Sequence, residues 1–503
     1  MVSRIACVGG GPGGLFFATL IKQAMPDVEV TVFERNRRED TFGFGVVFSD
    51  ATLAGIHEAD PVLLRGLRDH GRHWDRIEVR LNGQRLRCGG NGMAAIHRKT
   101  LLSLLQDRAV EVGVDLRFET EVAELSELDG YDLVVAADGA NSRIGAELAD
   151  ALAPSAEVAT AKFIWFGTSY LFEGLTFVHE RSPHGVFAVH GYPISDTIST
   201  FIVETDEESW RAAGLDEFDT SQPPGPSDEK TQRYLEKLFA EQIDGHPLLT
   251  NNSRWGNFRT RRARSWHHGN VVLLGDAAHT AHFSVGSGTK MAMEDAIALA
   301  EALTATPDDV EKALHGYEHV RSPQVAKIQD SARPSLSWWE HFGRYHDAFE
   351  PTQFAFHFLS RSIGRGKLAR RDPEFVATAE QSWRARHDGH DVLDTPLELD
   401  GVRLSGRFLT HDVSLGARVM RLAAPDDEAG LPAVFDEVAV RRPSVLIVHS
   451  GTSLTRALLS EQARLVHGVP TLLVEPDADA DRAATLVLSG RADAVATEGV
   501  GVW

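Results

Sequence analysis

The chain has little cysteine and no long apolar run. Only Cys7 and Cys88 occur among 503 residues, and Cys7 falls in a segment expected to be a buried strand. This pattern argues against a disulfide scaffold and against a zinc site, so we expect no metal. No apolar run approaches the length of a membrane span. The first expected strand begins within a few residues of Met1 and leaves no room for a signal peptide, so we expect a cytoplasmic protein.

Basic residues are also scarce relative to acidic ones. The chain has 51 Lys and Arg against 72 Asp and Glu, a formal net charge of −21. An acidic protein is repelled by nucleic acid and by anionic membrane surfaces, so we expect neither as a partner. The length allows two or three domains and a large core. We expect an acidic enzyme that is a monomer or a homodimer.

A glycine-rich turn follows the first expected strand. Ser3–Val8 reads as this strand, and LFFATLIKQA after the turn reads as a helix. The glycines of the turn are Gly9, Gly11, Gly13 and Gly14. The spacing G-x-G-x-x-G in a strand–turn–helix setting, with Glu34 ending the next strand twenty residues later, is typical of dinucleotide binding. Arg35 is a candidate neighbour of the adenine, or a solvated surface arginine.

Two later strands also end in glycine and aspartate. YDLVVAA is followed by Asp138-Gly139, and VVLL by Gly275-Asp276. Ligands of doubly wound sheets bind at the carboxyl ends of the strands, so the three strand ends should converge on one crevice. After the last one come Gly286, Gly288 and Thr289, then a helix whose N-terminus suits a negative group.

Two further stretches are candidates for cofactor contact. Arg98 stands just before a helix and is placed to reach a pyrophosphate, although a surface arginine is the alternative. In GFGVVFSD, Gly45 and Val46 belong to a glycine-bearing apolar loop. That loop is either plain core or a backbone wall beside a planar ring.

Lys162–Glu204 alternates between apolar and polar residues, which predicts antiparallel strands with one buried face. Its candidate pocket residues are Phe163, Trp165, His190 and Tyr192, with ordinary sheet packing as the alternative for each. The run Trp255–Arg264 is strongly basic. It reads either as a solvated edge strand or as a dock for a charged substrate tail, through Arg259, Arg261 and Arg262.

The three motifs, in this order over about residues 1–390, resemble the group A FAD-dependent aromatic hydroxylases, which have the para-hydroxybenzoate hydroxylase fold. The resemblance implies a Rossmann-like α/β FAD-binding domain with an inserted antiparallel sheet. It also implies tightly bound FAD, NADH or NADPH as a transient reductant, and O2 as co-substrate. Oxygen would reach the ring through a C4a-hydroperoxyflavin. Asp138 would lie near the pyrophosphate and Asp276 at the ribityl chain.

KFIWFGTSYLF, STFIVET and GDAAHTAHFSVGSGTKMAMEDA resemble a narrower branch of this family. That branch includes the salicylyl-CoA 5-hydroxylases and the 2-aminobenzoyl-CoA monooxygenase/reductases. The resemblance implies an aromatic acyl-CoA, or another acyl thioester, as substrate. His282 and Phe283 stand where the wider family has prolines. His282, with His190 and Tyr192, is a candidate to polarise the ring substituent, and Phe283 to contact the ring; a structural role is the alternative for His282.

From Thr395 the sequence resembles pieces of old-yellow-enzyme-type (β/α)8 flavoproteins, with Gly490-Arg491 as a relic of a phosphate loop. The remaining length is far short of the roughly 250 or more residues that a barrel needs. We therefore expect a contracted α/β remnant without FMN. The expected domains are 1–160 with 255–330 (FAD binding), 161–254 (substrate-covering sheet), 331–394 (helical closing segment and linker) and 395–503 (the remnant).

Three other functions remain open. One is hydroxylation of an indolic, tryptophan-derived substrate. Another is a flavin reductase or dehydrogenase on the same fold, without insertion of oxygen. The third is a catalytically silent protein that uses its C-terminal region as an interaction module.

Overall fold

The computed structural model describes residues 2–41, 43–219, 225–282, 288–415 and 418–497. The chain divides into two compact units, each described here by itself. The first unit comprises Met1–Arg76 and Asn91–Glu340, and the second comprises Ile77–Gly90 and His341–Trp503. Both units combine helices with sheets, so the fold is of the mixed α/β type.

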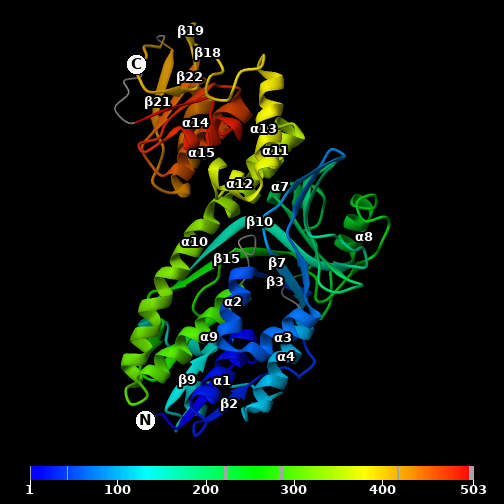
Figure 1. The fold of residues 1–503 in the computed structure, drawn as a ribbon, viewed down its shortest axis with the longest axis vertical. Coiled ribbons are helices and arrows are strands. Elements are labelled where there is room, and N and C mark those ends of the chain that lie inside the picture. The colour runs from blue at the N-terminus through cyan, green and yellow to red at the C-terminus, as the bar shows by residue number, and fades with distance from the viewer. Residues whose placement is uncertain (1, 42, 220–224, 283–287, 416–417, 498–503) are drawn as a thin grey trace. The chain divides into compact units, whose positions relative to one another are not determined.

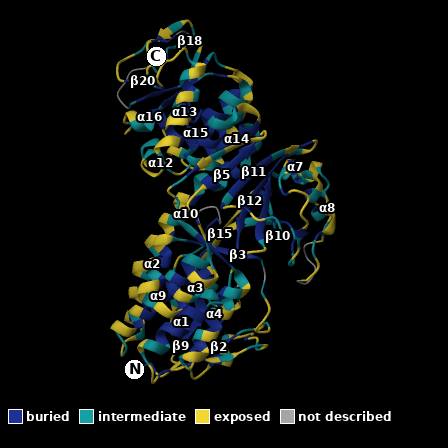
Figure 2. Cartoon of the chain, turned by 45° about the vertical axis from the view of Figure 1, so that its right-hand side comes forward, coloured by how far each residue is buried: buried dark blue, intermediate teal, exposed yellow. Residues whose placement is uncertain are grey.

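A parallel sheet forms the base of the first unit (Figure 1), in the order β16-β17-β9-β1-β2-β8, with only β16 antiparallel to its neighbour. The strands are β1 (Arg4–Val8), β2 (Glu29–Phe33), β8 (Asp115–Arg117), β9 (Leu133–Ala136), β16 (His267–His268) and β17 (Val271–Leu273). Helix α1 (Pro12–Ala24) packs against α4 (Arg98–Glu111) and α9 (Gly288–Ala305). β1, β9 and α1 are largely buried (Figure 2) because their residues are apolar on both faces.

The turn between β1 and α1 depends on glycine. Gly9 has φ +112°, and a Cβ there would lie 2.3 Å from the carbonyl oxygen of Ala137. No L side chain fits this conformation and this space. β1 can therefore end directly beside the end of β9, so that both strand ends open onto one place.

An antiparallel sheet covers the other part of the first unit, in the order β14-β10-β13-β12-β11 with β15 beside β10. Its strands are β10 (Pro154–Thr168), β11 (Leu175–Ser182), β12 (Gly185–Pro193), β13 (Ser199–Thr205), β14 (Leu248–Leu249) and β15 (Gly256–Ala263). One face packs on α8 (Glu229–Leu238) through a core that includes Ile164, Phe166, Val189, Phe201 and Leu235. Side chains alternate between the two faces of a strand, so the residues that lie between those of this core point to the other face of the sheet.

Smaller elements complete the first unit. A three-stranded sheet in the order β3-β7-β4 consists of β3 (Gly45–Ser49), β7 (Met93–His97) and β4 (Arg72–Trp74). The remaining helices are α2 (Asp50–Ala59), α3 (Pro61–His70), α5 (Arg143–Glu147), α6 (Ala149–Leu152) and α7 (Glu207–Ala212). The long helix α10 (Val310–Ala348) begins in this unit and contains Pro323 and Pro334.

The second unit has a parallel sheet in the order β20-β24-β23-β22-β21. Its strands are β20 (Phe408–Leu409), β21 (Val419–Ala423), β22 (Val445–His449), β23 (Thr471–Val474) and β24 (Ala494–Ala496). Two hairpins belong to the unit, β5 (Ile77–Leu81) with β6 (Gln84–Cys88), and β18 (Leu397–Leu399) with β19 (Val402–Leu404). Its helices are α11 (Pro351–Leu359), α12 (Arg365–Arg371), α13 (Pro373–Arg386), α14 (Leu431–Arg441), α15 (Ser453–Glu461) and α16 (Ala480–Leu488).

Helices α12 and α13 occupy much of the C-terminal part of residues 331–394, the stretch expected to be a helical closing segment and linker. α13 begins at the N-cap Asp372, whose side chain accepts a hydrogen bond from the backbone N–H of Phe375. It buries Phe375, Val376, Ala379 and Trp383, one stripe of an otherwise charged helix. This stripe is narrow, so the charged residues around it hid the helical period.

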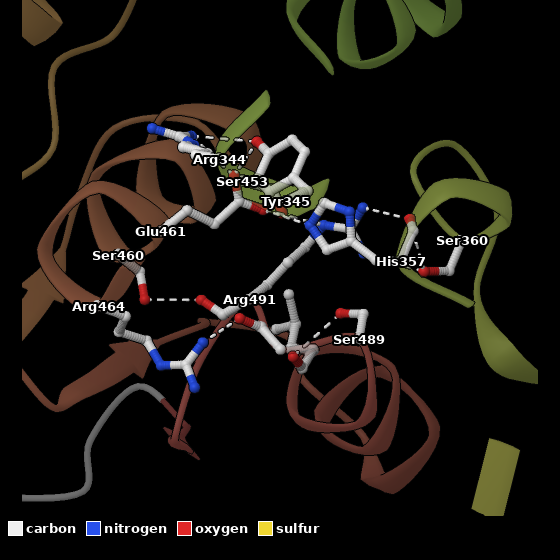
Figure 3. A network of polar contacts seen from close by, with 12 residues as sticks. Arg344, Tyr345, His357, Ser360, Ser453, Ser460, Glu461, Arg464, Ser489 and Arg491 are labelled. Carbon is white, nitrogen blue, oxygen red and sulfur yellow. Dashed lines mark hydrogen bonds and ion pairs between the residues drawn. The ribbon is translucent and has the colours of Figure 1, made fainter. Parts of the chain in front are cut away.

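A buried polar network joins three segments of the second unit (Figure 3). Glu461, at the end of α15, accepts hydrogen bonds from Arg344 (3.0 Å), His357 (3.0 Å) and the hydroxyl of Tyr345. Arg491 lies 3.5 Å from the same carboxylate and donates to the backbone oxygen of His357. Gly490-Arg491 lies shortly before β24, and the guanidinium of Arg491 is engaged by Glu461 and the backbone of His357.

Among the described helices, none combines the length and the apolar character needed to cross a membrane.

Candidate active site

The ends of β1, β2 and β9 line a cavity of about 270 Å3 in the first unit, here called the dinucleotide cavity. The predicted cofactor-binding residues in its wall are Gly9, Gly11, Glu34, Arg35, Arg98 and Asp138. Gly13 and Gly14 are not in this wall. They lie buried in α1, where a Cβ on Gly13 would meet Leu274 at 2.6 Å, so Gly13 permits close packing rather than ligand contact.

Glu34 is held at the edge of the dinucleotide cavity by backbone donors. Its Oε2 accepts from the N–H of Gly10 at 2.8 Å, and its Oε1 accepts from the N–H and the side-chain amide of Asn36 at 2.8 and 2.7 Å. These bonds fix the carboxylate at the exit of β2. A carboxylate in this place is suited to accept hydrogen bonds from ribose hydroxyls.

Two features of the dinucleotide cavity fit a bound dinucleotide. A Cβ on Gly11 would meet nothing within 4 Å, so the backbone at the start of α1 faces open space. Asp138 Oδ2 accepts from the N–H of Arg143 at 2.8 Å, whereas the buried Oδ1 of Asp138 has no hydrogen-bond partner within the described protein. A buried acceptor of this kind requires a donor from a ligand or solvent.

A second cavity of about 420 Å3, here called the aromatic cavity, lies between β3, the antiparallel sheet and the start of α9. The predicted residues in its wall are Gly45, Val46, Arg98, Phe163, Trp165, His190, Tyr192, Asp276, Gly288 and Thr289. Phe177, Ile202, Phe258 and Lys290 also line it and were not predicted. The volume and the mostly apolar wall suit a small aromatic ligand. Arg98 belongs to both walls, which makes the two cavities neighbours.

Strand register brings the aromatic side chains to one face. Phe163 pairs with Glu204, and Trp165 and His190 each pair with Ile202. Phe177 on β11 is opposite His190. Residues that are directly opposite point to the same side of a sheet, so these residues share one face, and Phe163, Trp165, Phe177 and His190 on it line the aromatic cavity.

Asp276 and Arg98 carry opposite charges and interact electrostatically inside the first unit. Asp276 borders the aromatic cavity and is exposed there, and desolvation by the protein around it raises its pKa, although His279 and Arg98 act to lower it. Burial likewise lowers the pKa of Arg98, against the attraction of Asp276. A Cβ on Gly288 would come within 2.8 Å of Asp276 Oδ1, so the glycine allows the helix start to approach the carboxylate.

Asp295, which the sequence patterns did not single out, anchors the turn at Gly275-Asp276. Its Oδ2 accepts from the N–H of Gly275 at 3.2 Å and from Nε2 of His279 at 2.7 Å. Its Oδ1 accepts from Nε of Arg321 at 2.8 Å. Asp295 therefore holds the turn that carries Asp276.

The second residue that sequence reasoning missed is Glu204, which joins the two candidate histidines. Glu204 Oε2 lies 2.8 Å from Nε2 of His190, and Oε1 lies 3.1 Å from Nε2 of His282. All three side chains are buried. A glutamate at an inward position of the apolar strand STFIVET is the signal that could have revealed it.

Several predicted residues lie elsewhere. His282 is not in the wall of the aromatic cavity but packs edge-on against Phe258, with ring centroids 5.0 Å apart. Arg259, Arg261 and Arg262 line neither of the two cavities. Arg261 donates to the carbonyl oxygen of Ala140 at 2.7 Å, and Arg262 pairs with Glu157 at 3.2 Å. Phe283 and Gly286 lie outside the described residues.

Comparisons with known proteins agree with this geometry. Residues 130–332 match the model of the FAD binding domain family. Salicyloyl-CoA 5-hydroxylase from Streptomyces sp. is 60% identical, over 98% of this chain and 99% of that protein. The 3-hydroxy-4-methyl-anthranilyl-[aryl-carrier protein] 5-monooxygenase of Streptosporangium sibiricum is 38% identical, over 67% of this chain and 89% of that protein.

The fold is also similar to a solved structure. The p-nitrophenol 4-monooxygenase of Pseudomonas putida DLL-E4 superposes with a TM-score of 0.58 at 17% identity, over 76% of this chain and 98% of that one. At this identity the likeness shows the fold alone. Together with the 60% identical relative and the two cavities at the strand ends, it leads to one conclusion. The chain belongs to the FAD-dependent aromatic hydroxylases.

Proposed function

We propose that this protein hydroxylates the ring of a salicyl-type aromatic acyl thioester, with coenzyme A as the leading carrier. The observation that carries the proposal is the 60% identity, over nearly the whole of both chains, to a salicyloyl-CoA 5-hydroxylase. The aromatic cavity supports it, because Phe163, Trp165 and Phe177 supply ring faces and edges for an aromatic acyl group.

FAD would be held by both cavities. Glu34 would accept from the ribose, the N–H groups after Gly11 would meet the pyrophosphate with Arg98, and Asp276 would accept from the ribityl hydroxyls. When bound there, FAD would supply the oxygen-insertion chemistry, with NAD(P)H as reductant and O2 as co-substrate. Thr289, Gly45 and Val46 would form the wall beside the isoalloxazine ring.

The chain's own residues would position and activate the substrate. His190 and Tyr192 border the aromatic cavity, where they can contact a ring hydroxyl or the thioester carbonyl. His282 would act on the substrate through Glu204 rather than by contact. The apolar wall excludes water, which strengthens each polar contact inside it.

The proposal also covers the other domains and the arginines of β15. Residues 161–254 would cover the substrate, and Arg259, Arg261 and Arg262 would meet a phosphorylated tail. Residues 395–503 would be a barrel remnant that binds no FMN. We also propose a cytoplasmic monomer or homodimer that needs no metal.

The decisive experiment compares salicyl-CoA with free salicylate. Binding energy from the coenzyme tail helps to position the ring, so kcat/KM should be much higher for the thioester. Flavin extracted from the purified protein should be FAD at one equivalent per chain. Equal turnover of acid and thioester would contradict the tail dock, and FMN beside FAD would contradict the proposed remnant.

Replacing Asp276 tests the cofactor site directly. Asp276→Ala should weaken FAD binding by about 10- to 100-fold, since a charge-assisted hydrogen bond is worth roughly 1.5–3 kcal/mol. Flavin retained after gel filtration measures the effect. Asp330→Ala, at an exposed position near Arg262, is the control and should retain FAD. Unchanged affinity in Asp276→Ala would remove this residue from the site.

A further inference from the structure

We propose that Glu204 is a positioning residue that enables His190 to take the proton of the substrate's ring hydroxyl. The proposal rests on the proposed function, because it requires a hydroxylated aromatic ring in the aromatic cavity. It assigns Glu204, which is not itself part of either cavity wall, a role exerted through the wall residue His190.

The sheet itself creates the contact. His190 on β12 is directly opposite Ile202 on β13, and Glu204 is two residues further along the same face. A long side chain reaches such a diagonal neighbour, and Glu204 Oε2 lies 2.8 Å from His190 Nε2. The loop after β17 brings His282 Nε2 to within 3.1 Å of the other oxygen. Exposed fractions of 4% for His190 and 2% for Glu204 and His282 exclude bulk water.

Charge fixes the direction of the hydrogen bonds. Burial acts to raise the pKa of Glu204, but His190 and His282 outweigh it and lower this pKa below the usual value. An ionised carboxylate only accepts, so both histidines donate through Nε2. In neutral His190 the lone pair is then on Nδ1, the nitrogen that can accept a proton. Glu204 thereby selects the tautomer.

The same carboxylate stabilises the product of the proton transfer. A buried imidazolium without a counter-ion is costly, and Glu204 at 2.8 Å supplies one. Two aromatic rings add to this, since the His190 ring lies 4.8 Å from Phe177 and 4.5 Å from Trp339, measured between centroids. Aromatic rings close to a cation attract it. The site is therefore built to carry one positive charge on His190.

The step moves one proton and no other atom. The O–H bond of the ring hydroxyl breaks, an N–H bond forms on His190, and the bonding electron pair stays on the phenolic oxygen. No oxidation occurs in this step. The phenolate donates electrons to the ring positions ortho and para to it, and in a salicyl group position 5 is para to the hydroxyl. The ring becomes more reactive where the oxygen atom is to enter.

Other ionisable groups border the same cavity and do not replace His190. Arg98 and Lys290 are cations that favour a phenolate but accept no proton. Burial raises the pKa of Tyr192, so its hydroxyl stays protonated. Asp276 is beside Arg98 at the cofactor end. His179 stacks on Trp339, with ring centroids 6.2 Å apart.

The first test reads the ionisation of the bound substrate at equilibrium. Salicyl-CoA bound to the oxidised wild-type holoenzyme should show the ultraviolet difference spectrum of a phenolate near pH 7. In Glu204→Gln the amide can donate as well as accept, so it no longer dictates the tautomer, and it carries no charge to balance an imidazolium; the phenolate should form only about 1–3 pH units higher. A phenolate at the wild-type pH in this variant would overturn the proposal.

The second test uses turnover with two substrates. Glu204→Gln should lower kcat for salicyl-CoA about 100-fold at pH 7, with KM little changed and kcat recovering as pH rises. An amino group activates the ring without losing a proton, so 2-aminobenzoyl-CoA should lose far less. Equal loss with both substrates would mean that Glu204 only supports the fold, and would overturn the proposal.

Two controls separate the possible failures. Glu180→Gln alters a half-buried carboxylate of the same sheet, bonded to Gln242 at 2.7 Å, and should leave the spectrum and both rates unchanged. If Glu204→Gln fails to retain FAD, His190→Gln keeps an acceptor and a donor and carries the same spectral test. Wild-type protein that neither binds nor hydroxylates salicyl-CoA would refute the proposed function instead.

Discussion

Two buried glutamates of this protein, Glu204 and Glu461, are each bonded to a histidine but differ in their other partners. Glu204 in the first unit and Glu461 in the second unit each accept a hydrogen bond from a buried histidine, at 2.8 and 3.0 Å. In the described part of the chain, the side chains bonded to Glu204 are two imidazoles. Glu461 also contacts the guanidinium groups of Arg344 and Arg491 (Figure 3).

Burial and, after it, the permanent charges of the arginines set the pKa of the histidine beside Glu461. Although burial opposes ionisation, His357, Arg344 and Arg491 lower the pKa of Glu461 far below its usual value. Burial, with Arg491 next, lowers the pKa of His357 to about 3. His357 therefore stays neutral at any physiological pH. A carboxylate already balanced by arginines does not stabilise a further proton, whereas one balanced by imidazoles does.

The two clusters also differ in whether they reach a cavity. The Glu461 cluster joins α10, α11 and α15 and borders neither of the two cavities. The Glu204 cluster reaches the aromatic cavity through His190. Variants of the first should therefore change stability without changing chemistry, and variants of the second should do the reverse.

The largest effect is expected for Glu461→Gln. Removing the carboxylate leaves Arg344 and Arg491 buried without their counter-ion, which should lower the free energy of unfolding by about 3–5 kcal/mol. Urea unfolding followed by circular dichroism measures it. Glu380→Gln, which breaks the more exposed pair with Arg365, is the control and should cost about 1 kcal/mol or less. Comparable losses in Glu461→Gln and Glu380→Gln would show that Glu461 is no more important for stability than the carboxylate of a more exposed ion pair, and would contradict its structural role.

A smaller effect is expected for His357→Gln, and it depends on pH. The pKa of His357 is lowered to about 3 by folding, so below about pH 6.5 the unfolded chain binds a proton that the folded chain does not. Wild-type stability should therefore fall with decreasing pH by up to about 1.4 kcal/mol per unit from this group. His357→Gln should lack that component between pH 6 and pH 5, in urea unfolding at each pH. Parallel pH profiles would show that His357 can be protonated in the folded state.

The smallest effect is expected for Tyr345→Phe. The variant removes the hydroxyl that donates to Glu461 and retains the ring that stacks on Phe349, so the loss should be about 1 kcal/mol. kcat should not change. Tyr192→Phe is the matched variant in the first unit, where turnover rather than stability should respond. A loss of activity in Tyr345→Phe would contradict a purely structural second cluster.

Local sequence patterns predicted much of the first unit. The glycine turn after β1 and the spacing to Glu34 depend on residues that are close together in the chain. The structure places Gly11 and Glu34 in one cavity wall. The alternation of Lys162–Glu204 likewise placed Phe163, Trp165, His190 and Tyr192 on one face, because a strand repeats every two residues. The catalytic and binding roles of these residues stay predictions.

Contacts between distant segments could not be predicted in this way. Glu204 and His282 are 78 positions apart, and Arg344 and Glu461 are 117 apart. Alternation indicates that Glu204 faces inward but does not name its partner. The arginines after Trp255 look free in the sequence, whereas Arg262 pairs with Glu157 on a neighbouring strand. The sequence shows that a run of residues is basic, but it does not show which acidic residues pair with that run in the folded protein.

Arg98 is part of the wall of both cavities. In terms of thermodynamic linkage, a side chain shared by two sites couples their occupants. If a molecule in the aromatic cavity changes the affinity for the dinucleotide by some factor, the dinucleotide changes the affinity for that molecule by the same factor. Arg98 is half-buried, so water screens its attraction to a nearby anion less than it would at an open surface. Cofactor retention should therefore depend on which substrate is present.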